Sequence, residues 1–110
     1  MKRVLFICSR NRRRSPTAEQ VFSDRENWEV ASAGLSPDAE ELLTDETVDW
    51  ADVIFVMEKR HRAKLTQRFG AQLKNKRVVC LDIPDNFEYL QPELVALLET
   101  KVRAILPDGG

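Results

Sequence analysis

Cys8 and Arg14 enclose a five-residue loop within the sequence CSRNRRRS. The loop follows a short apolar run, residues 4–7, and precedes a segment, residues 16–22, whose composition favours a helix. A strand–loop–helix turn of this kind directs backbone N–H groups and the positive end of the helix dipole at one point, where they stabilise an anion. We therefore predict a phosphate-binding loop with a thiol beneath the anion.

The residue types suit phosphoryl transfer. A thiol beside arginines and a helix N-terminus ionises readily, so Cys8 is the candidate nucleophile that would form a cysteinyl-phosphate. The planar guanidinium of Arg14 can bind two phosphate oxygens, and it binds them better as charge spreads onto them in the transition state. The remaining donors are expected from the loop itself, and the candidate phosphate-binding residues are Ser9, Arg10, Asn11, Arg12, Arg13 and Ser15.

Two loop residues have further expected roles. Ser15 can donate its hydroxyl to the sulfur, and with Pro16 at the first helical position it can also cap the helix. Asn11 lies mid-loop, where a short amide side chain tolerates left-handed backbone geometry and can tie the loop to its neighbours. The alternative is that Cys8 is a buried strand-end cysteine and that the arginines form a solvated basic loop.

These residues resemble the low-molecular-weight protein tyrosine phosphatases. The segment VLFICSRNRRRSPTAE carries the resemblance through an apolar strand and through Cys8, Asn11, Arg14, Ser15, Pro16, Ala18 and Glu19. WEVASAG, residues 28–34, and ADVIFVMEKRHRAKL, residues 51–65, look like later parts of the same family pattern. The resemblance implies hydrolysis of phosphotyrosine or another phosphomonoester, a phosphorylated protein or small phosphomonoester as partner, and a link from Asn11 to Ser15 and Ser32.

A phenolate leaves slowly from phosphorus unless a general acid protonates it. The segment LDIPDNFEY, residues 81–89, supplies two candidates, of which Asp85 fits the family pattern better and Asp82 is the reserve. Either aspartate can instead be an ordinary turn residue. Phe87 and Tyr89 could flank a substrate ring, or they could pack beneath a helix.

Apolar runs and helical periods alternate along the chain. Strands are predicted at residues 4–7, 28–33, 53–57 and 78–83, and helices at residues 16–22, 58–69 and from residue 92 onward, with Gly70 ending the second. This alternation predicts an α/β fold, a small open doubly wound sheet of four parallel strands with helices on both faces. The resemblance implies the strand order 2-1-3-4.

The chain has 110 residues, of which 43% are hydrophobic and 32% charged, and this composition predicts a single domain spanning residues 1–110. No apolar stretch is long enough for a membrane span, so we expect no membrane partner and a cytoplasmic protein. Both Cys8 and Cys80 are expected to be free thiols. Residues 108–110 are expected to form a loose tail.

Charge is distributed unevenly. Residues 1–15 carry six basic side chains and no acid, whereas residues 36–50 carry six acids and no base. The basic pole coincides with the loop and would attract anionic substrates. It is short and lacks interleaved aromatic residues, which argues against a nucleic acid partner.

Three function classes remain open: a phosphatase, a phosphate- or phosphoprotein-binding module without turnover, and an arsenate reductase-like protein, for which Cys80 is the one additional thiol. One histidine and two distant cysteines do not offer zinc spacing, so neither a metal nor another cofactor is expected. His61 is expected on a solvated helix face. The family members run longer between Gly34 and Trp50, so we expect a shallower and more basic mouth.

Overall fold

The computed structural model describes residues 1–106, and the expected tail at residues 108–110 lies outside them. Four parallel strands form one sheet in the order β2-β1-β3-β4, as predicted. The strands are β1 (Lys2–Cys8), β2 (Trp28–Gly34), β3 (Val53–Val56) and β4 (Arg77–Cys80). β1 and β3 lie in the centre, and β3 is buried along its whole length, which is why its sequence is continuously apolar.

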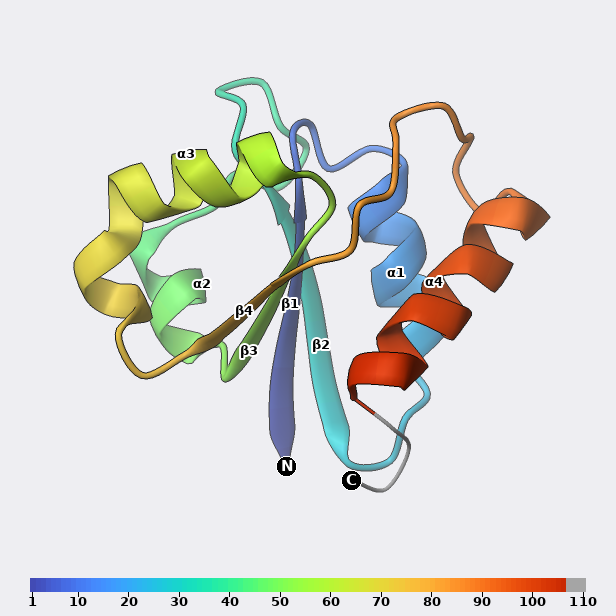
Figure 1. Cartoon of the computed structure of the whole chain (residues 1–110), viewed down its shortest axis with the longest axis horizontal. Helices are drawn as coiled ribbons and strands as arrows, with labels where there is room; N and C mark the ends of the chain where they lie inside the picture. Colours follow the sequence, from blue (N-terminus) through green and yellow to red (C-terminus); the bar gives the residue numbers. More distant parts are fainter. Residues whose placement is uncertain (107–110) are drawn as a thin grey trace.

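Helices cover both faces of the sheet (Figure 1). α1 (Arg14–Phe22) and α4 (Pro92–Ile105) pack on one face, and α2 (Asp45–Trp50) and α3 (Lys59–Phe69) pack on the other. Alternate residues of β1 point to opposite faces, so Phe6 belongs to the core under α1 and α4, whereas Ile7 belongs to the core under α2 and α3. The predicted α/β architecture with helices on both faces is confirmed.

Some predicted boundaries were wrong. β4 ends at Cys80 rather than at residue 83, because Asp82 adopts a left-handed backbone with φ of 54°. The chain nevertheless stays beside β3, since the N–H groups of Leu81 and Ile83 donate to the carbonyls of Val56 and Met57. The sequence pattern did not predict α2, a six-residue helix with one buried residue.

Of two predictions about helix ends, the first was also wrong. α1 begins at Arg14, so Ser15 lies inside the helix and does not cap it. The prediction that the second helix ends at Gly70 is confirmed, because α3 ends at Phe69 with Gly70 as its C-cap; the φ of Gly70 is a helical −50°, and a short 3₁₀ helix, η1 (Gly70–Leu73), follows.

The carboxyl ends of the strands share one edge of the sheet, and three loops gather there (Figure 1). They are the β1–α1 loop, residues 9–13, the β2–α2 segment, residues 35–44, and the β4–α4 loop, residues 81–91. Ligands of open parallel sheets bind at this edge, beside the point where the strand order reverses. Within residues 1–106 no helix is both long and apolar enough to cross a bilayer.

Candidate active site

The β1–α1 loop is held open by the segment that follows β2. Three successive loop carbonyls, those of Cys8, Ser9 and Arg10, accept hydrogen bonds from backbone N–H groups of that segment, at 3.1, 2.8 and 3.0 Å. All peptide bonds in the described residues are trans, so each N–H points opposite to the carbonyl of its own peptide group. The loop N–H groups of residues 9–11 are therefore turned away from the β2–α2 segment and toward the space above Cys8.

Gly34 makes this close approach possible. A Cβ atom at Gly34 would lie 2.6 Å from the carbonyl oxygen of Ser9 and 2.6 Å from the Cβ of Ala39. Neither contact is tolerable for a real side chain, and one of them is with backbone. The Ser-Ala-Gly ending of β2 thus has a physical reason, because the loop and the β2–α2 segment meet over the glycine.

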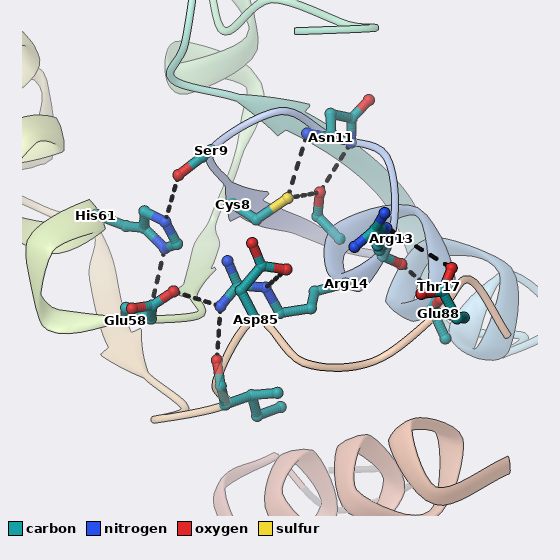
Figure 2. A network of polar contacts seen from close by, with 12 residues as sticks. Cys8, Ser9, Asn11, Arg13, Arg14, Thr17, Glu58, His61, Asp85 and Glu88 are labelled. Carbon is teal, nitrogen blue, oxygen red and sulfur yellow. Dashed lines mark hydrogen bonds and ion pairs between the residues drawn. The ribbon is translucent and has the colours of Figure 1, made fainter. Parts of the chain in front are cut away.

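Donors converge on the sulfur of Cys8, as Figure 2 shows. The backbone N–H of Asn11 donates to Sγ at 3.3 Å, and Ser15 Oγ lies 2.9 Å from Sγ. Asn11 adopts the predicted left-handed conformation, with φ of 56°. Its side-chain Nδ2 donates to Ser15 Oγ at 2.8 Å, which occupies a lone pair of that hydroxyl and leaves its hydrogen for the sulfur.

The same network continues away from the sulfur. Asn11 Nδ2 also donates to Ser32 Oγ at 2.9 Å, and Ser32 in turn donates to Glu19 Oε1 at 2.5 Å. A carboxylate only accepts, so the direction of every hydrogen in this chain is fixed outward from Asn11. The link from Asn11 to Ser15 and Ser32, which the resemblance implied, is present in the structure. We call Cys8, Asn11, Ser15 and Ser32 the floor of the site.

Arg14 is buried beside the floor and is held by three groups. Its side chain is 2% exposed, and Nη1 donates to Glu58 Oε2 and to the carbonyl oxygen of Ile83, both at 2.6 Å. Its Nε lies 3.7 Å from Asp85 Oδ1. Hydrogen bonds from Arg60 and then from Arg14 lower the pKa of Glu58 to about 2, against the opposing effect of partial burial. Glu58 is therefore an anion that fixes the orientation of the guanidinium.

The prediction that His61 is a solvated face residue was wrong. The side chain is 1% exposed, and its Nδ1 accepts a hydrogen bond from the backbone N–H of Glu58 at 3.1 Å, across the first turn of α3. Burial, with Arg14 close by, lowers the pKa of His61 to about 4, so the ring is neutral near pH 7. The proton then resides on Nε2, which lies 3.0 Å from Ser9 Oγ and donates to it. Ser9 keeps its own hydrogen for another acceptor.

A cavity of about 400 Å³ opens above the floor. Cys8, Ser9, Arg14 and Asp85 all line it, so the structure brings together the predicted nucleophile, phosphate-binding arginine and general acid. Asp82 does not line this cavity, and its Oδ1 lies 3.4 Å from the Cys80 sulfur.

The predicted aromatic residues are absent from the cavity lining. Phe87 is partly buried and packs against the core under α1 and α4. Tyr89 is 48% exposed and lies outside the lining. Within residues 1–106 no aromatic side chain lines this cavity.

Four further arginines line the cavity, and we call them the collar: Arg10, Arg12, Arg13 and Arg60. The first three belong to the predicted loop, and their side chains are 48 to 62% exposed. Sequence reasoning missed Arg60, together with Glu58 and His61. A signal was available, since Glu58 and His61 have the three-residue spacing at which a residue before a helix and one in its first turn exchange hydrogen bonds.

In the part of the chain that the structure describes, no cluster of three or more histidine, cysteine, aspartate or glutamate side chains could hold a metal ion. Cys8 and Cys80 are both free, as predicted. They lie on opposite faces of the sheet, because Cys8 belongs to the core under α1 and α4 and Cys80 packs against the core under α2 and α3.

No protein-family profile matches the sequence, and neither does any curated protein. Solved structures do match its fold. The YwlE arginine phosphatase from Geobacillus stearothermophilus is 22% identical with a TM-score of 0.76, over 96% of this chain and 93% of that one. Vibrio vulnificus Wzb in complex with benzylphosphonate is 25% identical with a TM-score of 0.76, over 94% of this chain and 95% of that one.

A third structure, the low molecular weight protein tyrosine phosphatase SP-PTP from Streptococcus pyogenes, is 16% identical with a TM-score of 0.77, over 96% of this chain and 94% of that one. The chain therefore has the fold of the low-molecular-weight protein tyrosine phosphatases, and the resemblance predicted from its first strand and loop is confirmed at that level. The predicted shortening between Gly34 and Trp50 stays a prediction.

Proposed function

We propose that this protein is a cysteine-dependent phosphatase that hydrolyses phosphomonoesters through a cysteinyl-phosphate intermediate. The observation that carries the proposal is the sulfur of Cys8, which receives the N–H of Asn11 and the hydroxyl of Ser15 at the bottom of a cavity that Arg14 and Asp85 also line. Donors aimed at a sulfur stabilise its thiolate form, and a thiolate is the form that attacks. The phosphatases that share the fold support the same reaction class.

In the first step the Cys8 thiolate attacks phosphorus, an S–P bond forms, and the bond between phosphorus and the leaving oxygen breaks. Asp85 donates a proton to that oxygen as it departs. Loop N–H groups, the Ser9 hydroxyl and the Arg14 guanidinium would hold the three equatorial oxygens, where charge accumulates in the transition state. Glu58 has a supporting role, because it keeps the guanidinium in place before the substrate arrives.

In the second step water attacks the phosphorus of the cysteinyl-phosphate while the Asp85 carboxylate accepts a proton from that water. The S–P bond breaks, and inorganic phosphate and the Cys8 thiolate are released. The Ser15 hydroxyl stabilises the sulfur as it leaves, just as it does before attack. Atoms and charge balance over the cycle, with one water consumed for each ester hydrolysed.

Hydrolysis of para-nitrophenyl phosphate by the wild-type protein and by Cys8→Ser tests the proposal. We expect activity in the wild type and background rates in the variant, and rapid acid quench of the wild-type reaction should trap one phosphate on Cys8. Inert wild-type protein that still binds phosphate or vanadate would favour a binding module. That alternative is supported by the Asp85 carboxylate lying near Arg14 rather than free above the sulfur.

The general acid is tested separately with a matched pair, Asp85→Asn and Asp82→Asn. With an alkyl-substituted phenyl phosphate, whose leaving group needs a proton, Asp85→Asn should lower kcat roughly 10²- to 10⁴-fold. Asp82→Asn should leave kcat unchanged, because Asp82 is outside the cavity and asparagine tolerates its positive φ. Equal losses in both variants would contradict the assignment to Asp85.

An arsenate reductase-like activity needs a thiol that can reach an adduct on Cys8. The candidate is Cys80, and it lies across the sheet from Cys8. We therefore do not propose that activity.

A further inference from the structure

The collar has more positive charge than a simple phosphate ester requires. In the proposed mechanism the loop N–H groups and Arg14 hold the phosphate itself, yet five of the eight residues that line the cavity are arginines. The four collar arginines line the same cavity as Cys8, so a leaving group in that cavity would lie beside them. Their planar forks suit carboxylate and phosphate oxygens.

Three collar arginines are paired, but loosely, whereas Arg60 donates to both carboxylate oxygens of Glu58, at 3.1 and 3.2 Å. Arg10 lies 3.7 Å from Asp38, Arg12 lies 3.3 Å from Glu40, and Arg13 lies 3.9 Å from Glu88. The three acids are 56 to 78% exposed and lie outside the cavity lining. Exposed ion pairs of this geometry contribute little free energy. An anionic ligand can therefore replace these three acids as the partner of the arginines at a small cost in free energy. Before a ligand binds, the ion pairs keep the guanidinium groups at the rim of the cavity.

The cavity offers little to an uncharged ring. Its lining within residues 1–106 contains no aromatic and no aliphatic side chain. A plain phenyl leaving group would meet no apolar side chain there, whereas a leaving group that bears anions would meet guanidiniums. The volume of about 400 Å³ accommodates a compact molecule larger than one phosphate.

We propose that the substrate of this site is a compact phosphomonoester whose leaving group carries at least one further anionic group, a carboxylate or a second phosphate, that the collar arginines bind. This inference rests on the proposed function for turnover but not for recognition. It assigns the selection of the substrate to the collar, Arg10, Arg12, Arg13 and Arg60, and leaves the chemistry to the residues named in the proposed function.

The test compares two aryl phosphates that differ in charge, 5-(phosphonooxy)isophthalate and its dicarboxamide. The carboxamide groups withdraw electrons more strongly, so intrinsic reactivity favours the dicarboxamide, and a preference for the dicarboxylate must come from the enzyme. We expect wild-type kcat/KM for the dicarboxylate to exceed that for the dicarboxamide about tenfold at low salt. The ratio should fall toward one as ionic strength rises.

Substitutions then assign the preference to the collar. Arg12→Gln and Arg13→Gln should each lower the ratio about threefold. Glu40→Gln should raise it, because it releases Arg12 from its counterion. Arg103→Gln is the matched control, since Arg103 is a similarly exposed arginine, paired with Glu99 on α4 and outside the cavity. It should leave the ratio unchanged.

A ratio near one in the wild type, or a ratio that the collar substitutions do not change, would overturn the inference while leaving the phosphatase proposal intact. If the wild type hydrolyses neither compound, the phosphatase proposal fails, and calorimetric binding of the two compounds to Cys8→Ser decides the collar question. Tighter binding of the dicarboxylate, weakened by adding Arg12→Gln, would then support it. Equal binding would reject it.

Discussion

The floor and the collar of the cavity are both built from polar side chains, yet they differ in burial and in how completely their hydrogen bonds are made. Asn11, Ser15 and Ser32 are 0 to 7% exposed and donate or accept within one directed network. The collar side chains that belong to the β1–α1 loop are about half exposed, and each lies 3.3 Å or more from its acidic partner. The floor is thus fixed before a ligand arrives, and the loop arginines of the collar are free to adapt to one, whereas Arg60 is hydrogen-bonded to Glu58.

This difference follows from where each set lies on the chain. Asn11 turns its side chain inward because its left-handed backbone reverses the direction of the loop, and its neighbours Arg10 and Arg12 are left facing outward. A buried polar group without a partner costs far more than an exposed one, so the inward positions must be satisfied. The comparison teaches that substitutions should act on folding and chemistry at the floor, and on selection at the collar.

The largest effect on stability is expected for Asn11→Ala. The change removes both side-chain hydrogen bonds to Ser15 and Ser32, leaves those buried hydroxyls without their donor, and places alanine at φ of 56°. We expect the free energy of unfolding to fall by about 4 kcal/mol and aryl phosphate turnover to be lost. Urea unfolding measures the first. Asn11→Gly, which relieves the backbone strain, should recover part of the stability but not the hydrogen bonds.

Gly34→Ala should have the next largest effect on stability. Its Cβ would lie 2.6 Å from the Ser9 carbonyl oxygen, so the loop must shift. We expect a loss of about 3 kcal/mol in unfolding free energy together with weaker binding of phosphate. Gly70→Ala is the matched control, because no atom beyond the neighbouring residues and the nearby helix backbone lies within 4 Å of the added Cβ, and φ is helical. That variant should be neutral or stabilised by about 0.5 kcal/mol. Similar losses at both glycines would contradict the close-approach argument.

His61 predicts a pH dependence of stability. Its pKa is about 4 in the folded protein and 6.5 ordinarily, so the unfolded chain binds more protons between these values. Stability is therefore full above pH 6.5 and falls as pH drops toward 4, by about 2 kcal/mol between pH 7 and pH 5. His61→Gln removes the titrating group, so urea unfolding at the two pH values should show a smaller difference in the variant. An equal difference would mean that another group is responsible.

Sequence reasoning succeeded where the chemistry lies in contiguous residues. Cys8, Asn11 and Arg14 lie within seven consecutive residues. The apolar runs of β1 and β3 correctly indicated strands that are buried on both faces of the sheet. It failed where the site depends on register between distant strands. Residues 7 and 56 are paired across β1 and β3, and this pairing brings the start of α3 beside the loop.

That register explains each missed contact. Glu58 lies 44 residues from Arg14, and His61 lies 52 residues from Ser9, so no local pattern joins them. The wrong cap at Ser15 has a related cause. A serine before Pro16 favours a cap on local grounds, but the network around the sulfur draws its hydroxyl inward instead. The preference of serine for a capping position was overridden by its hydrogen bonds within the loop.

The smallest effect on stability is expected at the collar, and a double-mutant cycle sharpens the comparison. Arg12→Gln, Glu40→Gln and the double variant should each change the unfolding free energy by less than about 0.5 kcal/mol, with a coupling that vanishes at 1 M salt. The cycle for Arg14 and Glu58, whose atoms lie 2.6 Å apart with Arg14 buried, should give a larger coupling that survives salt. If the Arg12–Glu40 coupling matches it, the collar is a structural clamp rather than an adaptable rim, since arginines held that firmly could not exchange their acids for a substrate.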